Sequence, residues 1–188
     1  MITFSIAFHG PFHVGTGEAE EGMDRTVDRD NLLPATSLKG LMRAEAVEVL
    51  GVDPALVADI FGAPGRAGAW WWSDGQIDPI RSAETPERPL IGRVARIRVD
   101  DAGLAMRGFL ALGEHVWAEG AHFTVGQLRE LTTEVTSRHT TILRAAARSV
   151  VSLGGARRRG EGWVTIVDDQ GDWTAADTTA LLSCRSAS

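Results

Sequence analysis

The sequence predicts an α+β fold with a modified ferredoxin-like core, a split βαβ arrangement with insertions, from the order of its apolar patterns. Residues 2–9 alternate apolar and polar side chains like a strand, whereas 37–50 and part of 127–151 have helical periodicity. A last apolar segment at 163–167 completes the order strand, helix, strands, helix, strand. A doubly wound dinucleotide fold fits poorly. Its Gly-rich loop follows a strand, whereas the Gly-rich segment 154–162 follows a helical pattern and precedes a strand.

Each element of the first half has its own local signal. A strand, two helices and a short strand are expected over 2–9, 37–50, 53–61 and 69–73. Thr36 or Ser37 can cap the first helix, because a hydroxyl accepts a hydrogen bond from the free N–H groups there. Asp53, followed by proline, starts the second helix. Alternation in the short strand would place Trp70 and Trp72 toward the core and their middle neighbour on the other side.

The second half is expected to hold three strands, a helix, a fourth strand and a short terminal helix. The three strands are expected over 91–99, about 105–112 and 115–125, and the helix from about Ser137. The fourth strand is expected over 163–167 and the short helix within 168–188. Two long connections, an acidic loop at 10–35 and an insertion at about 78–90, interrupt the elements. Without an internal repeat or a linker, residues 1–188 fit a single domain.

Composition predicts a cytoplasmic protein with no membrane partner. No apolar run approaches the ~18 residues that span a bilayer. The first residues, MITFSIAFH, lack the basic region of a signal peptide. Cys184 is the single cysteine, so the chain cannot form an internal disulfide.

Charge is segregated along the chain, although the net charge is −6. Residues 137–163 hold six arginines against one glutamate, and 18–30 hold six carboxylates against two arginines. Within the basic part lies GGARRRGEG at 154–162, called here the Gly-Arg loop. Its glycines permit close backbone approach and its arginines offer planar forks suited to phosphate. This pattern predicts a nucleic-acid partner bound through its backbone, and Arg144 and Arg148 on the preceding helix would extend the positive surface. The alternative is a tight turn whose arginines pair with carboxylates.

The start of the helix at 37–50 is a second candidate for phosphate contact. Its free N–H groups and positive dipole end attract anions. Ser37 and Lys39 sit there, Arg43 follows one turn later, and Lys39 is the single lysine against 18 arginines. Gly40 costs about 1 kcal/mol relative to alanine in a helix, which is easier to accept if something packs closely against it. Simple capping beside a solvated Lys/Arg pair is the alternative.

The acidic loop is ambiguous. Asp24, Asp28 and Asp30 could hold Mg²⁺, or one of them could position a nucleophile for phosphodiester cleavage, but such loops are often only solvated. His13 stands at a strand end before Gly15, where it could contact a ligand or serve a structural role. The His, Cys and Asp residues show no zinc-like spacing, and neither a Ser/His/Asp constellation nor a P-loop is recognisable.

Together these segments resemble the RAMP superfamily (repeat-associated mysterious proteins) of CRISPR effector subunits, in particular the backbone subunit of type III complexes. PFHVGTG at 11–17 resembles a family segment that follows the first strand, and DRTVDRD at 24–30 resembles its Asp-containing loop. LPATSLKGLMR at 33–43 is similar to the family's turn and helix, and 154–162 is similar to its C-terminal Gly-rich loop. The segment 108–125 resembles a weaker strand pair. Thr26, Asp28 and Ala35 depart from the family pattern.

The resemblance implies a ferredoxin-like (RRM-like) subunit that stacks with copies of itself into a filament on guide RNA (crRNA). Other CRISPR effector subunits and a complementary target RNA are the further partners. The residues implied in RNA binding are His13, Ser37, Lys39, Arg43, Gly155, Arg157, Arg158, Arg159 and Gly160. Asp24 would take part in cleavage of target RNA with Mg²⁺ or another divalent metal, in which a displaced nucleotide offers its 2′-OH for in-line attack.

We therefore expect a guide-RNA-binding backbone subunit of a type III CRISPR ribonucleoprotein in antiviral defence. It would act as a metal-dependent endoribonuclease within the assembled complex. A non-catalytic capping or structural subunit and a guide-RNA-processing relative share the same motifs and stay open. A metal-dependent enzyme acting on a small phosphorylated substrate is a further alternative.

Overall fold

The structure is a computed structural model that describes residues 1–15, 23–78 and 90–186. Part of the acidic loop expected at 10–35 and most of the insertion expected at 78–90 lie outside the described residues. The same holds for the side chain of Arg158.

The main sheet has the strand order β2-β6-β1-β7, and every neighbouring pair is antiparallel. Its strands are β1 (Ile2–Phe8), β2 (Trp70–Trp72), β6 (Gly120–Gln127) and β7 (Val164–Asp168), and β3 (Gln76–Ile77) also pairs with β6. This order, with the first strand between the third and last strands of the core, is that of a ferredoxin-like fold. The predicted α+β fold class is therefore confirmed.

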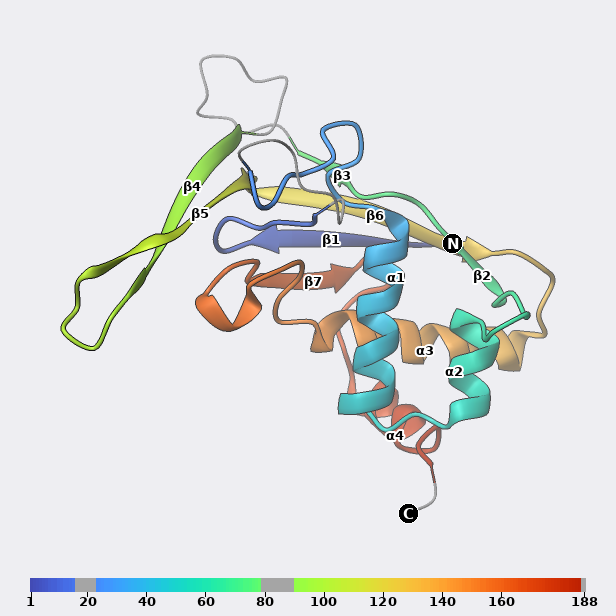
Figure 1. The fold of residues 1–188 in the computed structure, drawn as a ribbon. Helices are drawn as coiled ribbons and strands as arrows, with labels where there is room; N and C mark the ends of the chain where they lie inside the picture. Colours follow the sequence, from blue (N-terminus) through green and yellow to red (C-terminus); the bar gives the residue numbers. More distant parts are fainter. Residues whose placement is uncertain (16–22, 79–89, 187–188) are drawn as a thin grey trace.

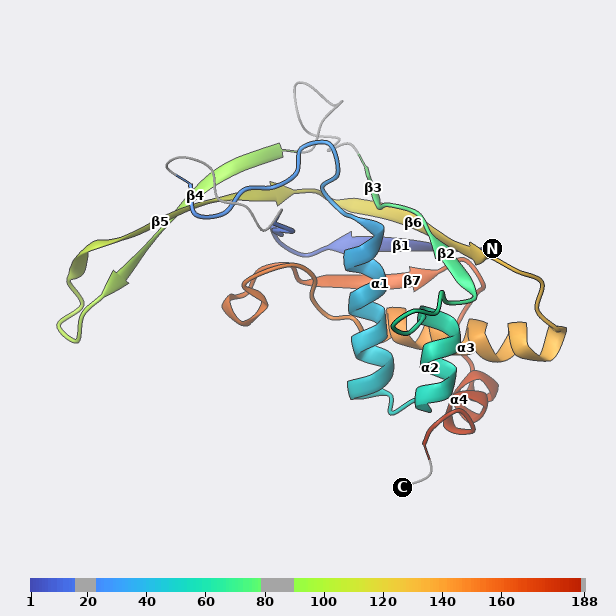
Figure 2. The same ribbon diagram turned by 45° about the vertical axis from the view of Figure 1, so that its right-hand side comes forward.

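Four helices cover the same face of this sheet (Figures 1 and 2). They are α1 (Ala35–Ala44), which continues into a π-helical turn (Glu45–Val49), α2 (Pro54–Phe61), α3 (Thr133–Ser149) and α4 (Ala175–Leu182). On β1, Phe4, Ile6 and Phe8 are buried toward the helices, whereas Ser5 and Ala7 between them are exposed on the other face. Strict alternation therefore gives one core face and one open face, as the period-2 pattern predicts. No helix within 1–15, 23–78 and 90–186 is both long and apolar enough to cross a membrane.

A second, two-stranded sheet projects from the main body as a long hairpin of β4 (Leu90–Val99) and β5 (Ala105–Trp117) (Figure 1). The sequence predicted a break near Gly113, but β5 runs straight through it and ends before β6. Gly113 lies inside the strand, where it pairs with Val94 of β4 and forms an isolated parallel bridge with Arg25. A Cβ there would make only an ordinary contact, 3.4 Å from the Arg25 Nε, so packing does not require glycine at this position.

The start of α1 differs from the prediction. Neither Thr36 nor Ser37 caps it, because the helix begins at Ala35 after Pro34. The Asp74 Oδ1 accepts a hydrogen bond from the Ala35 N–H at 2.7 Å, so a carboxylate of this chain already occupies the position expected to bind an anion. The helix α2 begins as predicted after Asp53.

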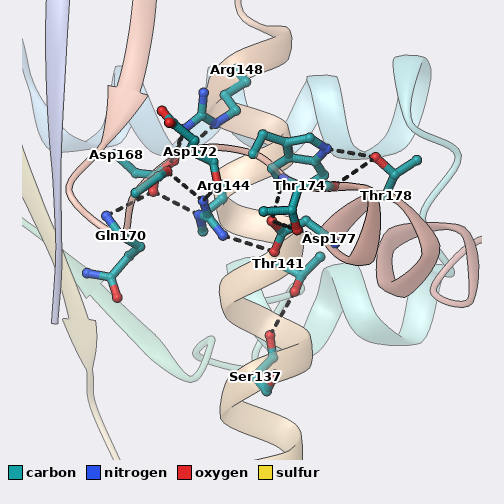
Figure 3. Close-up of polar contacts among 12 residues, drawn as sticks. Ser137, Thr141, Arg144, Arg148, Asp168, Gln170, Asp172, Thr174, Asp177 and Thr178 are labelled. Carbon is teal, nitrogen blue, oxygen red and sulfur yellow. Dashed lines mark hydrogen bonds and ion pairs between the residues drawn. The ribbon is translucent and has the colours of Figure 1, made fainter.

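Arg144 and Arg148 of α3 do not extend a positive surface toward the Gly-Arg loop, contrary to expectation. Both pair with Asp168 at the end of β7, at 2.8 and 2.9 Å, and the Asp168 side chain is fully buried. Arg144 also pairs with Asp177 of α4 at 3.0 Å and lies 5.5 Å from the ring centre of Trp173 (Figure 3). These arginines therefore serve to hold α4 and the end of β7 against α3.

Candidate nucleic-acid interface

The Gly-Arg loop has a fixed shape that depends on its glycines. It forms a short 3₁₀ turn over Arg157–Arg159, with left-handed backbone at Ala156 (φ 55°) and Gly160 (φ 82°) on either side. At Gly154 (φ 77°) a Cβ would lie only 2.3 Å from the His13 carbonyl oxygen, so only glycine permits this approach. The next residue, Gly155, donates its N–H to the same carbonyl at 2.7 Å.

His13 therefore faces the protein interior. The His13 side chain is only 4% exposed, and its Nδ1–H donates to the Glu114 carbonyl of β5 at 2.8 Å. Burial, the largest influence, lowers the pKa of the His13 imidazole, so the ring is neutral near pH 7. The buried ring is not positioned to contact a ligand directly, contrary to the expectation from the sequence. His13 instead links the Gly-Arg loop, through its carbonyl, to β5, through its ring.

A groove of about 790 Å³ lies between the hairpin, the Gly-Arg loop and the segment around Asp24, and is called here the Asp24 groove. Its charged lining consists of one carboxylate and four arginines: Asp24, Arg25, Arg96, Arg98 and Arg159. Phe109 also lines it, with the Arg98 guanidinium 5.4 Å from its ring centre. The groove is thus strongly positive, although the whole chain is acidic.

Asp24 is exposed in this groove but is held in one orientation. Its N–H donates to the Leu112 carbonyl at 2.9 Å, and its Oδ2 accepts from the Leu112 N–H at 2.8 Å. Two hydrogen bonds to one residue of β5 hold Asp24 against the middle of the hairpin, where Leu112 pairs with Ala95 of β4. A fixed, solvent-accessible carboxylate beside four guanidinium groups suits a site where a phosphodiester is bound and a proton or cation is handled.

Beneath the groove, the buried carboxylate of Glu161 joins three segments that are far apart in sequence. It pairs with Arg96 of the hairpin and, at 3.9 Å, with Arg25. The His115 Nε2 lies 3.4 Å from the same carboxylate, and burial together with the charges of Arg96 and Arg25 lowers the pKa of that imidazole. Burial, with the positive charges of Arg25 and Arg159, also lowers the pKa of Arg96, as expected for arginines crowded into one field.

A second buried glutamate, Glu114, holds the segment that follows Asp24. It pairs with Arg29 and accepts a hydrogen bond from the Val27 N–H at 3.2 Å. Neither Glu114 nor Glu161 is among the site residues predicted from the sequence. One signal was present: GEHVW at 113–117 places two ionisable residues in an apolar strand, and buried charges require partners.

A smaller cavity of about 300 Å³, called here the α1 pocket, lies between α1 and the Gly-Arg loop. It is mostly apolar, with Ser37 and Arg157 as its polar lining residues. Burial raises the pKa of the Glu45 carboxyl, and the charge of nearby Arg157 opposes this rise, which places Arg157 beside α1. The α1 pocket therefore lies between a helix and a loop that are separated by more than a hundred residues in the sequence.

The structure divides the predicted site residues between several places. Arg157 faces the α1 pocket, whereas Arg159 faces the Asp24 groove. Lys39 and Arg43 line neither cavity, because Lys39 is two positions from Ser37 and projects from another side of α1. The three aspartates do not converge, since the Asp28 Oδ1 instead accepts the backbone N–H groups of Asp30 and Asn31 at 2.9 and 3.2 Å. Among the described residues no three His, Cys, Asp or Glu side chains are grouped so as to hold a metal.

Comparisons with known proteins show a family that matches most of the sequence and solved structures with a similar fold. A family model described as the RAMP superfamily matches residues 5–165. No curated protein matches the sequence. A chain of the apo-state cryo-EM structure of type III-B Cmr-beta has a TM-score of 0.68 and 16% identity over 90% of this chain and 97% of that chain. A chain of Cmr-beta bound to cognate target RNA gives 0.63 and 17% over 89% and 96%, and a chain of a type IV-B CRISPR complex gives 0.58 and 18% over 93% and 92%.

Proposed function

The chain belongs to the RAMP superfamily, and from that membership we propose that it is a guide-RNA-binding subunit of a type III CRISPR effector complex. The observation that carries the proposal is the Asp24 groove, which four arginines from three separate segments line together with one fixed carboxylate. Two of the similar structures are of type III-B Cmr-beta, one of them bound to cognate target RNA. The further partners would be copies of this chain, other effector subunits and target RNA.

Binding would depend on phosphate rather than on sequence. Arg157 and Arg159 are exposed and form no ion pair with a described carboxylate, so their guanidinium groups are available. Arginine clusters of this kind bind the sugar–phosphate backbone and leave the bases free for pairing. The buried ring of His13 supports binding indirectly, because it anchors the loop that carries these arginines.

Cleavage of target RNA would be centred on Asp24. In this reaction the 2′-oxygen of a displaced nucleotide loses its proton and attacks the adjacent phosphorus in line. The P–O5′ bond breaks, and the O5′ leaves with a proton. Asp24 is exposed in the groove and held by Leu112, so it can accept a proton or a cation at a defined position.

The Asp24 groove offers Mg²⁺ few protein ligands. Asp24 supplies one carboxylate, which agrees with the habit of Mg²⁺ to bind one or two carboxylates and to take its other ligands from phosphate and water. Asp24 would therefore hold the ion only together with bound RNA. When bound, a divalent cation neutralises charge on the phosphate, and the neighbouring arginines contribute to the same task.

The test uses the effector complex purified from the native host. We expect co-purifying RNA of defined length together with several different proteins. Replacement of Asp24 by alanine should abolish cleavage of a complementary target and leave guide content unchanged, whereas Asp28→Ala, at an exposed turn, should cleave normally. A preparation without RNA would contradict guide binding and would favour an enzyme for a small phosphorylated substrate.

One observation favours a second function, a non-catalytic structural or capping subunit. The described residues offer a single carboxylate at the groove rather than a cluster. Unchanged target cleavage by Asp24→Ala complexes would assign this role.

A further inference from the structure

His115 and Glu161 face each other beneath the Asp24 groove, and each has one buried polar atom without a hydrogen bond. The His115 side chain is buried, and its Nε2 has no hydrogen-bond partner within the part of the chain that the structure describes. The same holds for the Glu161 Oε2, which lies 3.4 Å from that nitrogen. Buried polar atoms in folded proteins are nearly always paired. These two atoms therefore form a pair that is incomplete in the RNA-free protein.

A proton on the His115 ring would complete this pair. A carboxylate oxygen can only accept a hydrogen bond, so the His115 Nε2 must carry the hydrogen. The charged and titratable groups that face the ring are Arg96 of β4, Arg25, His13 and Glu161. Burial, followed by the charges of the two arginines and the other imidazole, lowers the pKa of His115. The ring is therefore uncharged near pH 7 as long as both arginines face it.

Arg25 links this buried pair to the groove. Its guanidinium lies 3.9 Å from the Glu161 Oε2, and the same side chain lines the Asp24 groove. Arg96 differs, because it pairs closely with the other oxygen of the Glu161 carboxylate. An ion pair at 3.9 Å that involves a partly exposed arginine is weak, so a phosphate in the groove draws Arg25 away more easily than Arg96. The Glu161 Oε2 then loses a positive neighbour.

We propose that His115 is a positioning residue of the Asp24 groove: when Arg25 turns to an RNA phosphate, the His115 ring takes a proton from solvent and donates a hydrogen bond to Glu161. The proposal rests on the proposed function, because it needs a phosphate in the groove. Glu161 then keeps two positive partners, the imidazolium and Arg96, so the hairpin stays anchored while Arg25 is engaged. RNA binding takes up a proton, and by linkage the affinity rises as the pH falls.

Isothermal titration calorimetry of the full-length protein with oligouridylate counts these protons, in two buffers of equal pH and different ionisation enthalpy. The wild type should take up close to one proton on binding, and its affinity should rise by up to about tenfold per pH unit between pH 8 and 6.5. His115→Gln keeps a side-chain N–H donor but cannot be protonated. It should therefore show no proton uptake and a flat pH profile.

His139→Gln is the matched control. It removes another buried imidazole with a lowered pKa, whose Nδ1 accepts the Trp70 indole N–H away from the groove, so the uptake should persist. Glu161→Gln removes the acceptor carboxylate, should abolish the uptake as well, and repeats the test if His115→Gln folds poorly.

A purely structural role for His115 would weaken RNA binding without changing the proton count, and that result would overturn the proposal. Binding by the wild type without proton uptake would overturn it too, yet RNA binding would stand. A wild type that does not bind oligouridylate would overturn both, because no phosphate would then engage Arg25.

Discussion

Arg96 and Glu161 form an ion pair that joins the projecting β4–β5 hairpin to the end of the Gly-Arg loop. The Glu161 side chain is 8% exposed and that of Arg96 is 26% exposed, so the pair is shielded from solvent on the glutamate side. An isolated two-stranded hairpin is marginal in water. The hairpin therefore depends on contacts such as this one, which holds β4 where Arg96 pairs with Ala111 of β5, and the shape of the Asp24 groove depends on the position of the hairpin.

Removal of this anchor should loosen the hairpin. Glu161→Gln leaves Arg96 and Arg25 without their shared carboxylate, and we expect the free energy of unfolding to fall by about 2 kcal/mol. Urea denaturation measures the change. The matched control is Glu134→Gln, whose side chain is 83% exposed in an i,i+4 pair with Arg138 and should change stability by less than about 0.5 kcal/mol. Equal effects in the two variants would show that Glu161 anchors nothing.

Gly154 and Gly160, two of the left-handed glycines of the Gly-Arg loop, should respond differently to alanine. Gly154→Ala combines a left-handed backbone, which costs about 1–2 kcal/mol, with a Cβ 2.3 Å from the His13 carbonyl. It should therefore cost clearly more than Gly160→Ala, which has the same backbone cost but open space around its Cβ. Thermal unfolding of both variants compares them. An equal loss of stability would mean that the loop shifts freely away from His13.

Local sequence patterns predicted the helices and strands of this fold well. The partners of its charged side chains depend on contacts between segments far apart in the sequence, which local patterns do not show. Alternation placed β1 and β7 correctly, and the cap of α2 followed from two adjacent residues. The cap of α1 comes from Asp74, in a loop remote in sequence, so no local rule could find it. Gly113 was predicted to break a strand, but β5 continues through it because its pairing with β4 extends on both sides of the glycine.

The same distinction applies to the site. The Gly-Arg loop was visible in the sequence because its residues are contiguous. The Asp24 groove could be predicted only in part from the sequence, because nothing in the pattern distinguishes Arg96 and Arg98 on the hairpin from ordinary strand residues. Arg144 was misassigned because helical periodicity shows which residues share a face but not what covers that face.

Arg144 should be a structural residue without a role in RNA binding. Arg144→Ala removes one of the two arginines that pair with the fully buried Asp168 side chain and leaves Arg148 in place, so we expect a loss of about 2–3 kcal/mol, the scale of hydrogen bonds to a charged group. Arg138→Ala, on the exposed side of the same helix, should cost less than about 1 kcal/mol. Calorimetry gives both values. RNA affinity of the folded fraction of Arg144→Ala should match the wild type, and a specific loss would assign Arg144 to the interface after all.

Stability should decline in mild acid because three buried imidazoles resist protonation. Burial lowers the pKa of His13, His115 and His139, and at His139 the Nδ1 accepts the Trp70 indole N–H at 3.1 Å. In the unfolded chain these groups titrate near pH 6.5. The unfolded state therefore binds more protons below that pH, and stability falls as the pH decreases from about 6.5 toward the lowered folded values.

Each such histidine contributes up to about 1.4 kcal/mol per pH unit. Urea denaturation at a series of pH values between 7.5 and 5.5 measures the slope. His139→Gln should remove about one proton from the uptake on unfolding, because glutamine does not titrate. A free energy of unfolding that stays constant over this range would show that the three rings protonate freely in the folded state.

The salt dependence of RNA binding separates a free arginine from one that is already paired. Arg159 lines the Asp24 groove without an ion pair to a described carboxylate, whereas Arg129 pairs with Asp59 at 2.7 Å. Loss of one phosphate contact to a single strand reduces the slope of log affinity against log salt by about 0.7. Arg159→Ala should show that reduction and Arg129→Ala should not, as titrations of single-stranded RNA at several salt concentrations can measure. An unchanged slope for Arg159→Ala would place the RNA backbone outside the Asp24 groove, and Asp24 would then be too far from the strand to act on it.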